Sequence, residues 1–130
     1  MRVIFLVLLT LCICGYNVLV PNTPLQMPNY ESTHASFFDD LIGAWGRLAP
    51  ENGLYAAVWE LARGTVLEVV HGEVACTVTV QDRGPAHHLV RSGRKLDLSP
   101  RAFERLSPLN RGVIPVKWRV LKQEESICGH

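Results

Sequence analysis

The chain has 130 residues, which is enough for one domain with a modest core. Its 13 lysines and arginines nearly balance its 12 aspartates and glutamates, and the balance is even once Arg2 is set aside. This neutrality argues against nucleic acid as the main partner, because a domain that binds nucleic acid needs a strongly basic face.

The amino-terminal segment differs in composition from the rest of the chain. Arg2 precedes a nearly unbroken apolar run over residues 3–14, and small and polar residues follow it. This order is typical of a secretory signal peptide. A lipoprotein signal acylated at Cys12 or Cys14 and an uncleaved membrane anchor through residues 3–20 are the alternatives. All three predict an exported protein of the periplasm or cell envelope, and the last two attach it to the membrane.

A Pro- and Asn-rich spacer follows the apolar segment and is typical of an extended linker. We expect a monomer with one compact domain between this linker and a short tail. The expected bounds are residues 1–20 for the signal peptide or anchor, 21–34 for the linker, 35–122 for the domain and 123–130 for the tail.

Two cysteines, Cys76 and Cys128, lie beyond the amino-terminal segment. An oxidising compartment would let them form a disulfide that pins the tail. The alternative is a buried free thiol at Cys76, which lies in an alternating apolar pattern.

The first stretch of the domain is ambiguous. Residues 35–48 have helical spacing, with Ser36 as a cap and Pro50 as a stop, but residues 35–38 also suit a strand. Strands are then expected over residues 66–70 and 73–81, joined by a turn at His71-Gly72.

The second half of the domain also consists of short predicted elements. Residues 96–98 suit a short strand or turn, and residues 101–106 a helix that Ser99 caps and Pro100 begins. Residues 113–121 alternate as a final strand. Several short strands with a brief helix favour a small β-barrel.

Two aspartates stand out at the ends of these elements. Asp82 begins an Asp-Arg-Gly-Pro sequence that no strand continues through, so it should lie at the mouth of its strand. Asp97 lies in a short apolar run just before the helix. A polar loop joins the two, which lets both carboxyl groups converge on one cleft.

The same segments resemble a known family. Residues 77–85, 96–99, 100–103 and 112–120 together resemble the double-psi β-barrel domain of the rare lipoprotein A family of peptidoglycan lytic transglycosylases and, more distantly, of bacterial expansins. The resemblance covers residues 56–121. It implies a mainly β fold, a small six-stranded double-psi β-barrel with one or two short helices.

The resemblance implies cleavage of peptidoglycan glycan strands, with Asp82 as general acid/base and Asp97 in support. In that chemistry a carboxyl group protonates the glycosidic oxygen and then accepts a proton from the sugar's own 6-hydroxyl, which leaves an anhydro sugar. The acid must hold its proton near neutral pH, so it needs an apolar pocket or a second carboxylate nearby. Asp97 is either that neighbouring carboxylate for Asp82 or itself the acid. Turn formation at Asp82 and backbone capping at Asp97 are the structural alternatives.

Candidate substrate-binding groups surround the two aspartates. Arg83 suits substrate carboxylates or acetamido groups, or an ion pair with either aspartate. The aromatic rings offer sugar-stacking platforms or core packing, and the loop histidines offer glycan contacts or simple solvation. No metal or other cofactor is expected, because the histidines lack a recognised ligand spacing. These candidates are Arg83, His87, His88, Trp45, Trp59 and Tyr55.

One departure from the family keeps a second function open. The transglycosylase pattern has a histidine directly after Ala56-Ala57, and this chain has Val58. That substitution favours a non-catalytic, expansin-like module that binds peptidoglycan or loosens the wall. A plain interaction domain of the cell envelope or of a phage particle is the third alternative.

Overall fold

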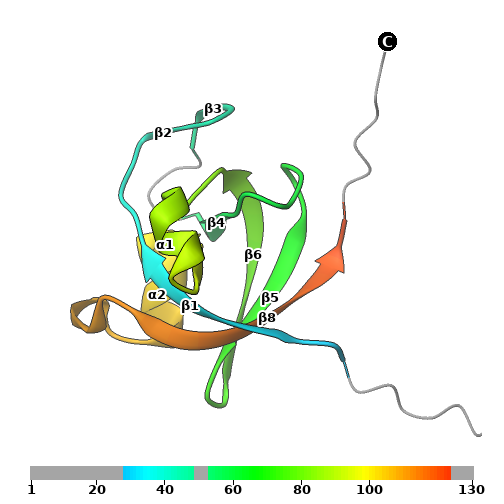
Figure 1. Ribbon diagram of the computed structural model, residues 1–130, viewed down its shortest axis with the longest axis vertical. Helices are drawn as coiled ribbons and strands as arrows, with labels where there is room; N and C mark the ends of the chain where they lie inside the picture. The colour runs from blue at the N-terminus through cyan, green and yellow to red at the C-terminus, as the bar shows by residue number, and fades with distance from the viewer. Residues whose placement is uncertain (1–27, 49–52, 124–130) are drawn as a thin grey trace, which may run out of the picture.

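The structure, a computed structural model, describes residues 28–48 and 53–123. The strands of this described part are β1 (Glu31–Phe37), β2 (Ile42–Gly43), β3 (Gly46–Arg47), β4 (Tyr55–Ala57), β5 (Val66–His71), β6 (Val74–Asp82), β7 (Arg94–Leu98) and β8 (Ile114–Lys122). Six of them close a barrel in the order β1, β7, β4, β6, β5, β8, and β2 with β3 forms a separate hairpin (Figure 1). The helices are α1 (His87–Arg91) and α2 (Pro100–Leu106), followed by a 3₁₀ turn, η1 (Leu109–Arg111). The predicted mainly β barrel of six strands with short helices is confirmed.

The barrel mixes parallel and antiparallel neighbours. β1 pairs in parallel with β7 and β4 pairs in parallel with β6, whereas the other four pairings are antiparallel. The β4–β6 register shifts between Ala56 and Ala57. Such a bulge re-aims side chains at a barrel rim. Here it sets Ala57 opposite Asp82, at the end of β6.

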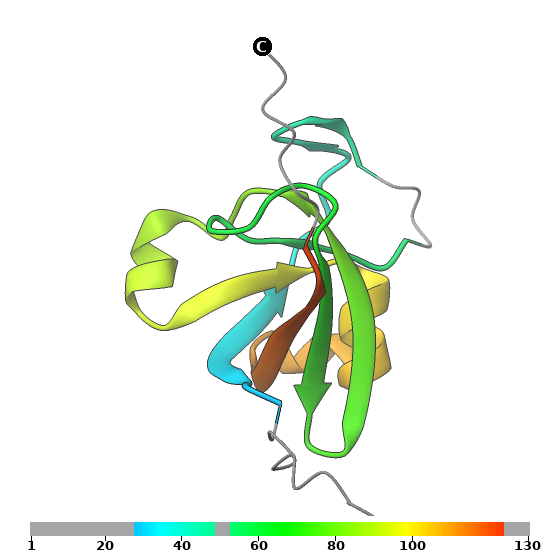
Figure 2. The same cartoon turned by 90° about the vertical axis from the view of Figure 1, so that its right-hand side faces the viewer.

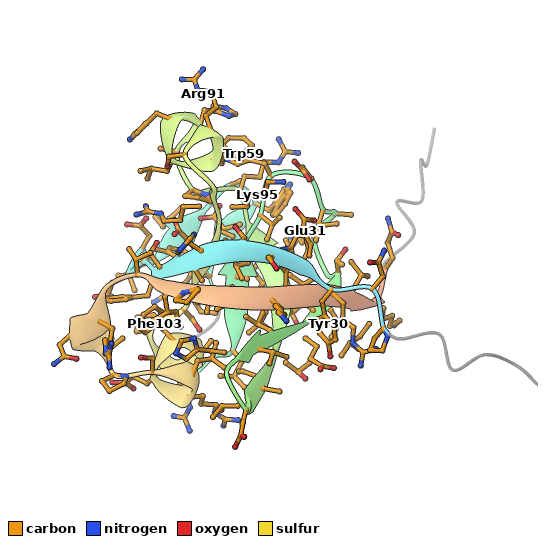
Figure 3. All side chains as sticks on the ribbon, turned by 60° about the horizontal axis from the view of Figure 1, so that its bottom comes forward. Tyr30, Glu31, Trp59, Arg91, Lys95 and Phe103 are labelled. Atoms are coloured by element: carbon orange, nitrogen blue, oxygen red, sulfur yellow. The ribbon has the colours of Figure 1, made fainter. Side chains whose placement is uncertain are left out.

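Strand alternation fills the barrel. The alternation along β6 buries Cys76, Val78 and Val80, whereas Val74, on the same face at the start of the strand, is exposed. The α2 helix closes the core beside it: Ser99 Oγ accepts a hydrogen bond from Ala102 N, and Pro100 begins the helix, as predicted. Phe103 on α2 is fully buried, as Figure 3 lets the reader follow. A capped, apolar-faced helix therefore seals one side of the barrel.

The described strands differ from the sequence expectations at three places. β1 begins at Glu31, so residues 31–34 belong to the barrel and not to the linker. The ambiguous stretch is this strand followed by the β2–β3 hairpin, and not a helix. The turn between β5 and β6 lies at Gly72-Glu73, because His71 still pairs with Val74.

The segment between the two aspartates contains a helix that the sequence analysis treated as a loop. α1 spans five residues, lies outside the barrel, and none of its residues is buried. Gly93, with a φ of +96°, follows it and turns the chain into β7. An exposed one-turn helix has no apolar periodicity, so the pattern could not reveal it.

Some expectations concern residues outside the described ranges. The signal peptide or anchor and Cys128 lie there. Cys76 is a buried free thiol, and burial raises its pKa. Within the described ranges, no helix combines the length and apolar character needed to cross a membrane.

Candidate functional site

Asp82 and Asp97 flank the same residue in the barrel wall. Ala57 on β4 pairs with Asp82 on β6 and with Asp97 on β7. Neighbouring strands lie about 4.8 Å apart, so the two aspartate backbones are separated by about 10 Å across one intervening strand. The structure thus brings both predicted carboxyl groups to one rim of the barrel.

Gly84 fills the space above Ala57. A Cβ atom at Gly84 would lie 3.3 Å from Ala57 Cβ and 3.9 Å from Asp97 Oδ2. The Asp-Arg-Gly-Pro segment therefore folds back from Asp82 toward Asp97. Glycine at this position keeps a side chain away from Asp97 Oδ2.

Asp97 occupies a mostly buried position, with 13% of its side chain exposed. Ser36 Oγ donates a hydrogen bond to Asp97 Oδ1, and Arg94 Nε lies 3.8 Å from the same oxygen. Burial raises the pKa of Asp97, while Ser36 and Arg94 act in the opposite direction. Asp97 is therefore a carboxyl group that holds its proton more strongly than an ordinary aspartate.

Asp82 is held in a different way. Its Oδ1 accepts hydrogen bonds from the backbone N–H of Ala44, at 2.6 Å, and of Arg83, at 2.8 Å. Its side chain is buried under the β2–β3 hairpin. The Arg83 guanidinium lies 5.1 Å from the centre of the Trp45 ring, a cation–π contact. Arg83 thus packs on the hairpin, and within the described part of the chain it forms no ion pair with either aspartate.

Trp59 and His87 form an aromatic pair at the segment that follows Asp82. Their rings stack with centroids 4.3 Å apart and planes 21° from parallel. Trp59 Nε1 also donates to the carbonyl oxygen of Pro85. Trp59 remains 39% exposed, and it lies next to α1 in Figure 3. His88 is exposed on the same helix. This pair is a partly open, rigid ring surface.

Tyr55 is too deeply buried to offer its ring for sugar stacking. Its ring is 5% exposed and packs edge-on against Phe38. Burial raises the pKa of Tyr55, and the negative charges of Asp39, Asp40 and Asp82 add to this. The hydroxyl therefore faces the acidic side of the site, while the ring belongs to the packing beneath it.

Val58 continues the chain from Ala57 and is buried in the barrel core. Its backbone N–H donates to the carbonyl oxygen of Asp82, at 3.1 Å. No imidazole therefore stands at this position next to Asp82. In the described ranges no three His, Cys, Asp or Glu side chains gather in a way that would hold a metal ion.

The sequence analysis missed several groups that shape the site. The sequence predicts Ser36 only as a helix cap and Arg94 only as one of several surface cations, and it indicates no role for Ala44. Their contacts with the aspartates cross 61, 38 and 3 positions of the chain. Only the Arg94–Asp97 spacing was available as a local signal.

Comparison with known proteins places this geometry in a family. A family model for the double-psi β-barrel described as lytic transglycolase matches residues 30–118. The chain belongs to this lytic transglycolase family. The resemblance inferred from the sequence is confirmed, and the model's first matched residue agrees with the early start of β1.

One curated relative of this lytic transglycolase domain is the probable endolytic peptidoglycan transglycosylase RlpA of Aquifex aeolicus (strain VF5). The two are 36% identical over 119 residues. The match covers 90% of this chain and 48% of the relative, so the chain spans about half the length of that protein.

Solved structures share the fold. The Streptomyces papain inhibitor matches with a TM-score of 0.61 and 24% identity, over 75% of this chain and 98% of the inhibitor. An apo expansin from Clavibacter michiganensis matches with a TM-score of 0.54 and 24% identity, over 74% of this chain and 53% of the expansin. A mutant of that expansin in complex with cellohexaose matches at 0.53 and 24% identity, over 71% of this chain and 51% of the expansin. At this identity the likeness establishes the barrel fold of the lytic transglycolase domain.

Proposed function

We propose that this protein cleaves the glycan strands of peptidoglycan by the lytic transglycosylase reaction, at Asp82 and Asp97. The observation that carries the proposal is the pairing of both residues with Ala57, in contrasting environments. Both carboxyl groups are largely buried, but the pKa of Asp97 is raised, whereas Asp82 is oriented by two backbone N–H groups. The family membership and the name of the Aquifex relative support the same substrate.

Asp97 is the proton donor in this proposal. The family resemblance implies Asp82 as the acid/base, with Asp97 as the alternative acid, and the raised pKa favours Asp97 for the first step. Both of its described polar contacts reach Oδ1, and Oδ2 lies on the side of Gly84, 3.9 Å from where a Cβ atom would stand at that glycine. The proton on Oδ2 passes to the glycosidic oxygen as the bond between that oxygen and the sugar C1 breaks.

Asp82 completes the reaction. Its carboxylate stabilises the positive charge that develops at C1 and accepts the proton of the substrate's 6-hydroxyl. The 6-oxygen bonds to C1, so the product is an anhydro sugar and no water is consumed. The proton that Asp82 gained then returns to Asp97, and both groups regain their starting states.

The surrounding groups suit a saccharide. The Trp59–His87 stack offers an apolar ring face at the segment that follows Asp82. Arg83 and Arg94 supply positive charge for the lactyl and peptide carboxylates that peptidoglycan carries. An expansin with the same fold has been crystallised with cellohexaose, an oligosaccharide. Action on this polymer requires an exported protein of the cell envelope, attached or not through residues 3–20.

The test is direct. The full chain is incubated with purified sacculi, and mass spectrometry measures anhydro-muropeptides. We expect Asp97→Asn and Asp82→Asn each to reduce their release about 100-fold or more, because each removes one proton-transfer group. Glu104→Gln, which neutralises an exposed carboxylate on α2, is the matched control and should cleave like the wild type. Products with hydrated reducing ends would instead indicate hydrolysis.

Val58 favours a second candidate, a non-catalytic module that binds or loosens the wall. The position that carries a histidine in the transglycosylase pattern is a buried valine here. Under this proposal the protein sediments with sacculi but releases no anhydro-muropeptides. Trp59→Ala would then weaken sedimentation. Asp97→Asn, like the wild type, would release no anhydro-muropeptides.

A further inference from the structure

The β2–β3 hairpin lies outside the barrel, at the end where β6 delivers Asp82 (Figures 1 and 2). Two residue pairs hold it together, Ile42 with Arg47 and Gly43 with Gly46. Leu48, directly after the hairpin, is buried and anchors its return. No barrel strand needs this hairpin for its pairing, so its position over Asp82 calls for another explanation.

The hairpin contacts Asp82 through its backbone. Ala44 N donates to Asp82 Oδ1 at 2.6 Å, a short hydrogen bond to a carboxyl oxygen. Arg83 N donates to the same oxygen from the other side. Among the described residues, no hydrogen bond reaches Asp82 Oδ2. Asp82 Oδ1 is therefore held by two backbone N–H groups.

Gly43 makes this approach sterically feasible. A Cβ atom there would lie 2.8 Å from Asp82 Cγ, 2.9 Å from Asp82 Oδ1 and 2.7 Å from Leu48 Cδ2. Real Cβ atoms do not come this close to other heavy atoms. The φ angle of Gly43 is not in the left-handed region. Glycine is required at position 43 for space and not for backbone conformation.

Gly46, the pairing partner of Gly43, shows the opposite case. Its φ is +112°, and a Cβ atom there would meet no atom within 4 Å. Glycine is required at Gly46 for backbone conformation alone. The two glycines of one hairpin therefore separate two effects, since a methyl group at Gly46 strains the turn and a methyl group at Gly43 intrudes on the carboxyl group.

We propose that Gly43 and Ala44 are positioning residues for Asp82, which orient its carboxyl group so that Oδ2 faces the substrate. This inference rests on the proposed function, in which Asp82 accepts a proton from the sugar. The hairpin also lies against Asp82, a residue that is 9% exposed, and so limits the access of bulk water to Oδ1. The cation–π contact between Trp45 and Arg83 holds the hairpin tip against Arg83, whose backbone N–H also donates to Asp82 Oδ1.

The structural part is tested by ¹⁵N–¹H NMR of the full chain. A short bond to a carboxylate moves an amide proton downfield, so we expect low-field signals for Ala44 and Arg83 that shift together in Asp82→Asn. Gly43→Ala should remove the low-field shift of Ala44, because the added methyl group displaces the hairpin. Gly46→Ala should keep it. An unshifted Ala44 signal in the wild type, or equal loss in both glycine variants, would overturn the proposal.

The functional part is tested by the kinetics of anhydro-muropeptide release. Gly43→Ala should lower kcat about 10-fold to 100-fold with little change in KM, because a misplacement of about 1 Å costs that much in rate. A fall in kcat for Gly46→Ala as large as for Gly43→Ala would contradict the positioning role. If the wild type releases no anhydro products while the Ala44 signal behaves as expected, the proposed function fails and the hairpin contact stands.

Discussion

Ser36 and Asp97 are joined by a hydrogen bond between two parallel strands. Ser36 on β1 pairs in register with Asp97 on β7, and its hydroxyl donates to Asp97 Oδ1. The bond lowers the pKa of Asp97 against the larger effect of burial, which raises it. One serine thus moderates how strongly the proposed acid holds its proton.

Replacing Ser36 by alanine should raise the pKa of Asp97 further, because a contact that favours the charged form is lost. The alkaline limb of the pH–rate profile for sacculus cleavage should move to higher pH. The fold should lose about 1 kcal/mol of stability. Ser32→Ala, at an exposed position on the same strand, is the control and should leave the profile unchanged. A shift to lower pH would contradict the assignment of Asp97 as the acid.

Asp97→Asn should stabilise the fold at neutral pH while it abolishes cleavage. The pKa of Asp97 is raised in the folded state, so its contribution to stability is present below the unfolded pKa and is lost as the pH rises through the folded pKa. Asparagine does not ionise, so the variant does not lose this stability as the pH rises. Urea unfolding between about pH 4 and pH 8 should show its advantage over the wild type growing with pH. An advantage that shrinks as pH rises would refute the raised pKa.

Trp59→Ala should weaken glycan binding, because it removes the exposed ring that stacks on His87. We expect KM for sacculus cleavage to rise about 5-fold to 10-fold, in line with roughly 1 kcal/mol for an aromatic contact. Trp59→Phe keeps a ring but loses the hydrogen bond to the Pro85 carbonyl, so its KM should lie between those of the wild type and Trp59→Ala. Equal KM values in all three proteins would place the glycan elsewhere.

Ser99→Ala should destabilise the barrel by about 1–3 kcal/mol, because it leaves buried backbone groups without partners. Ser99 Oγ accepts from Tyr55 N and Ala102 N and donates to the Gly53 carbonyl. Ser92→Ala is the matched control: the hydroxyl of this exposed serine donates to the Leu89 carbonyl, and the loss of that bond should cost about 0.5 kcal/mol or less. Chemical denaturation of both variants measures the difference.

Local chemistry in the sequence determined much of the barrel. The alternation along β6, its end at Asp-Arg-Gly-Pro, and the Ser99-Pro100 start of α2 are all encoded by neighbouring residues. These features suffice to predict a small barrel and to place Asp82 and Asp97 at element ends. The family resemblance extended this to the double-psi fold, which the family match confirms.

The environments of the two aspartates were decided only by the tertiary structure. The Ser36–Asp97 bond closes 61 positions of chain and the Ala44–Asp82 bond closes 38. The first depends on the β1–β7 register, because a one-residue slip would turn Asp97 to the other face, and the second depends on where the β2–β3 hairpin lies over the end of β6. No local pattern specifies that register, because it results from closing the whole barrel. The sequence therefore determined which carboxyl groups lie at the rim, and the closed barrel decided that Asp97 is buried with a raised pKa while Asp82 is held by backbone N–H groups.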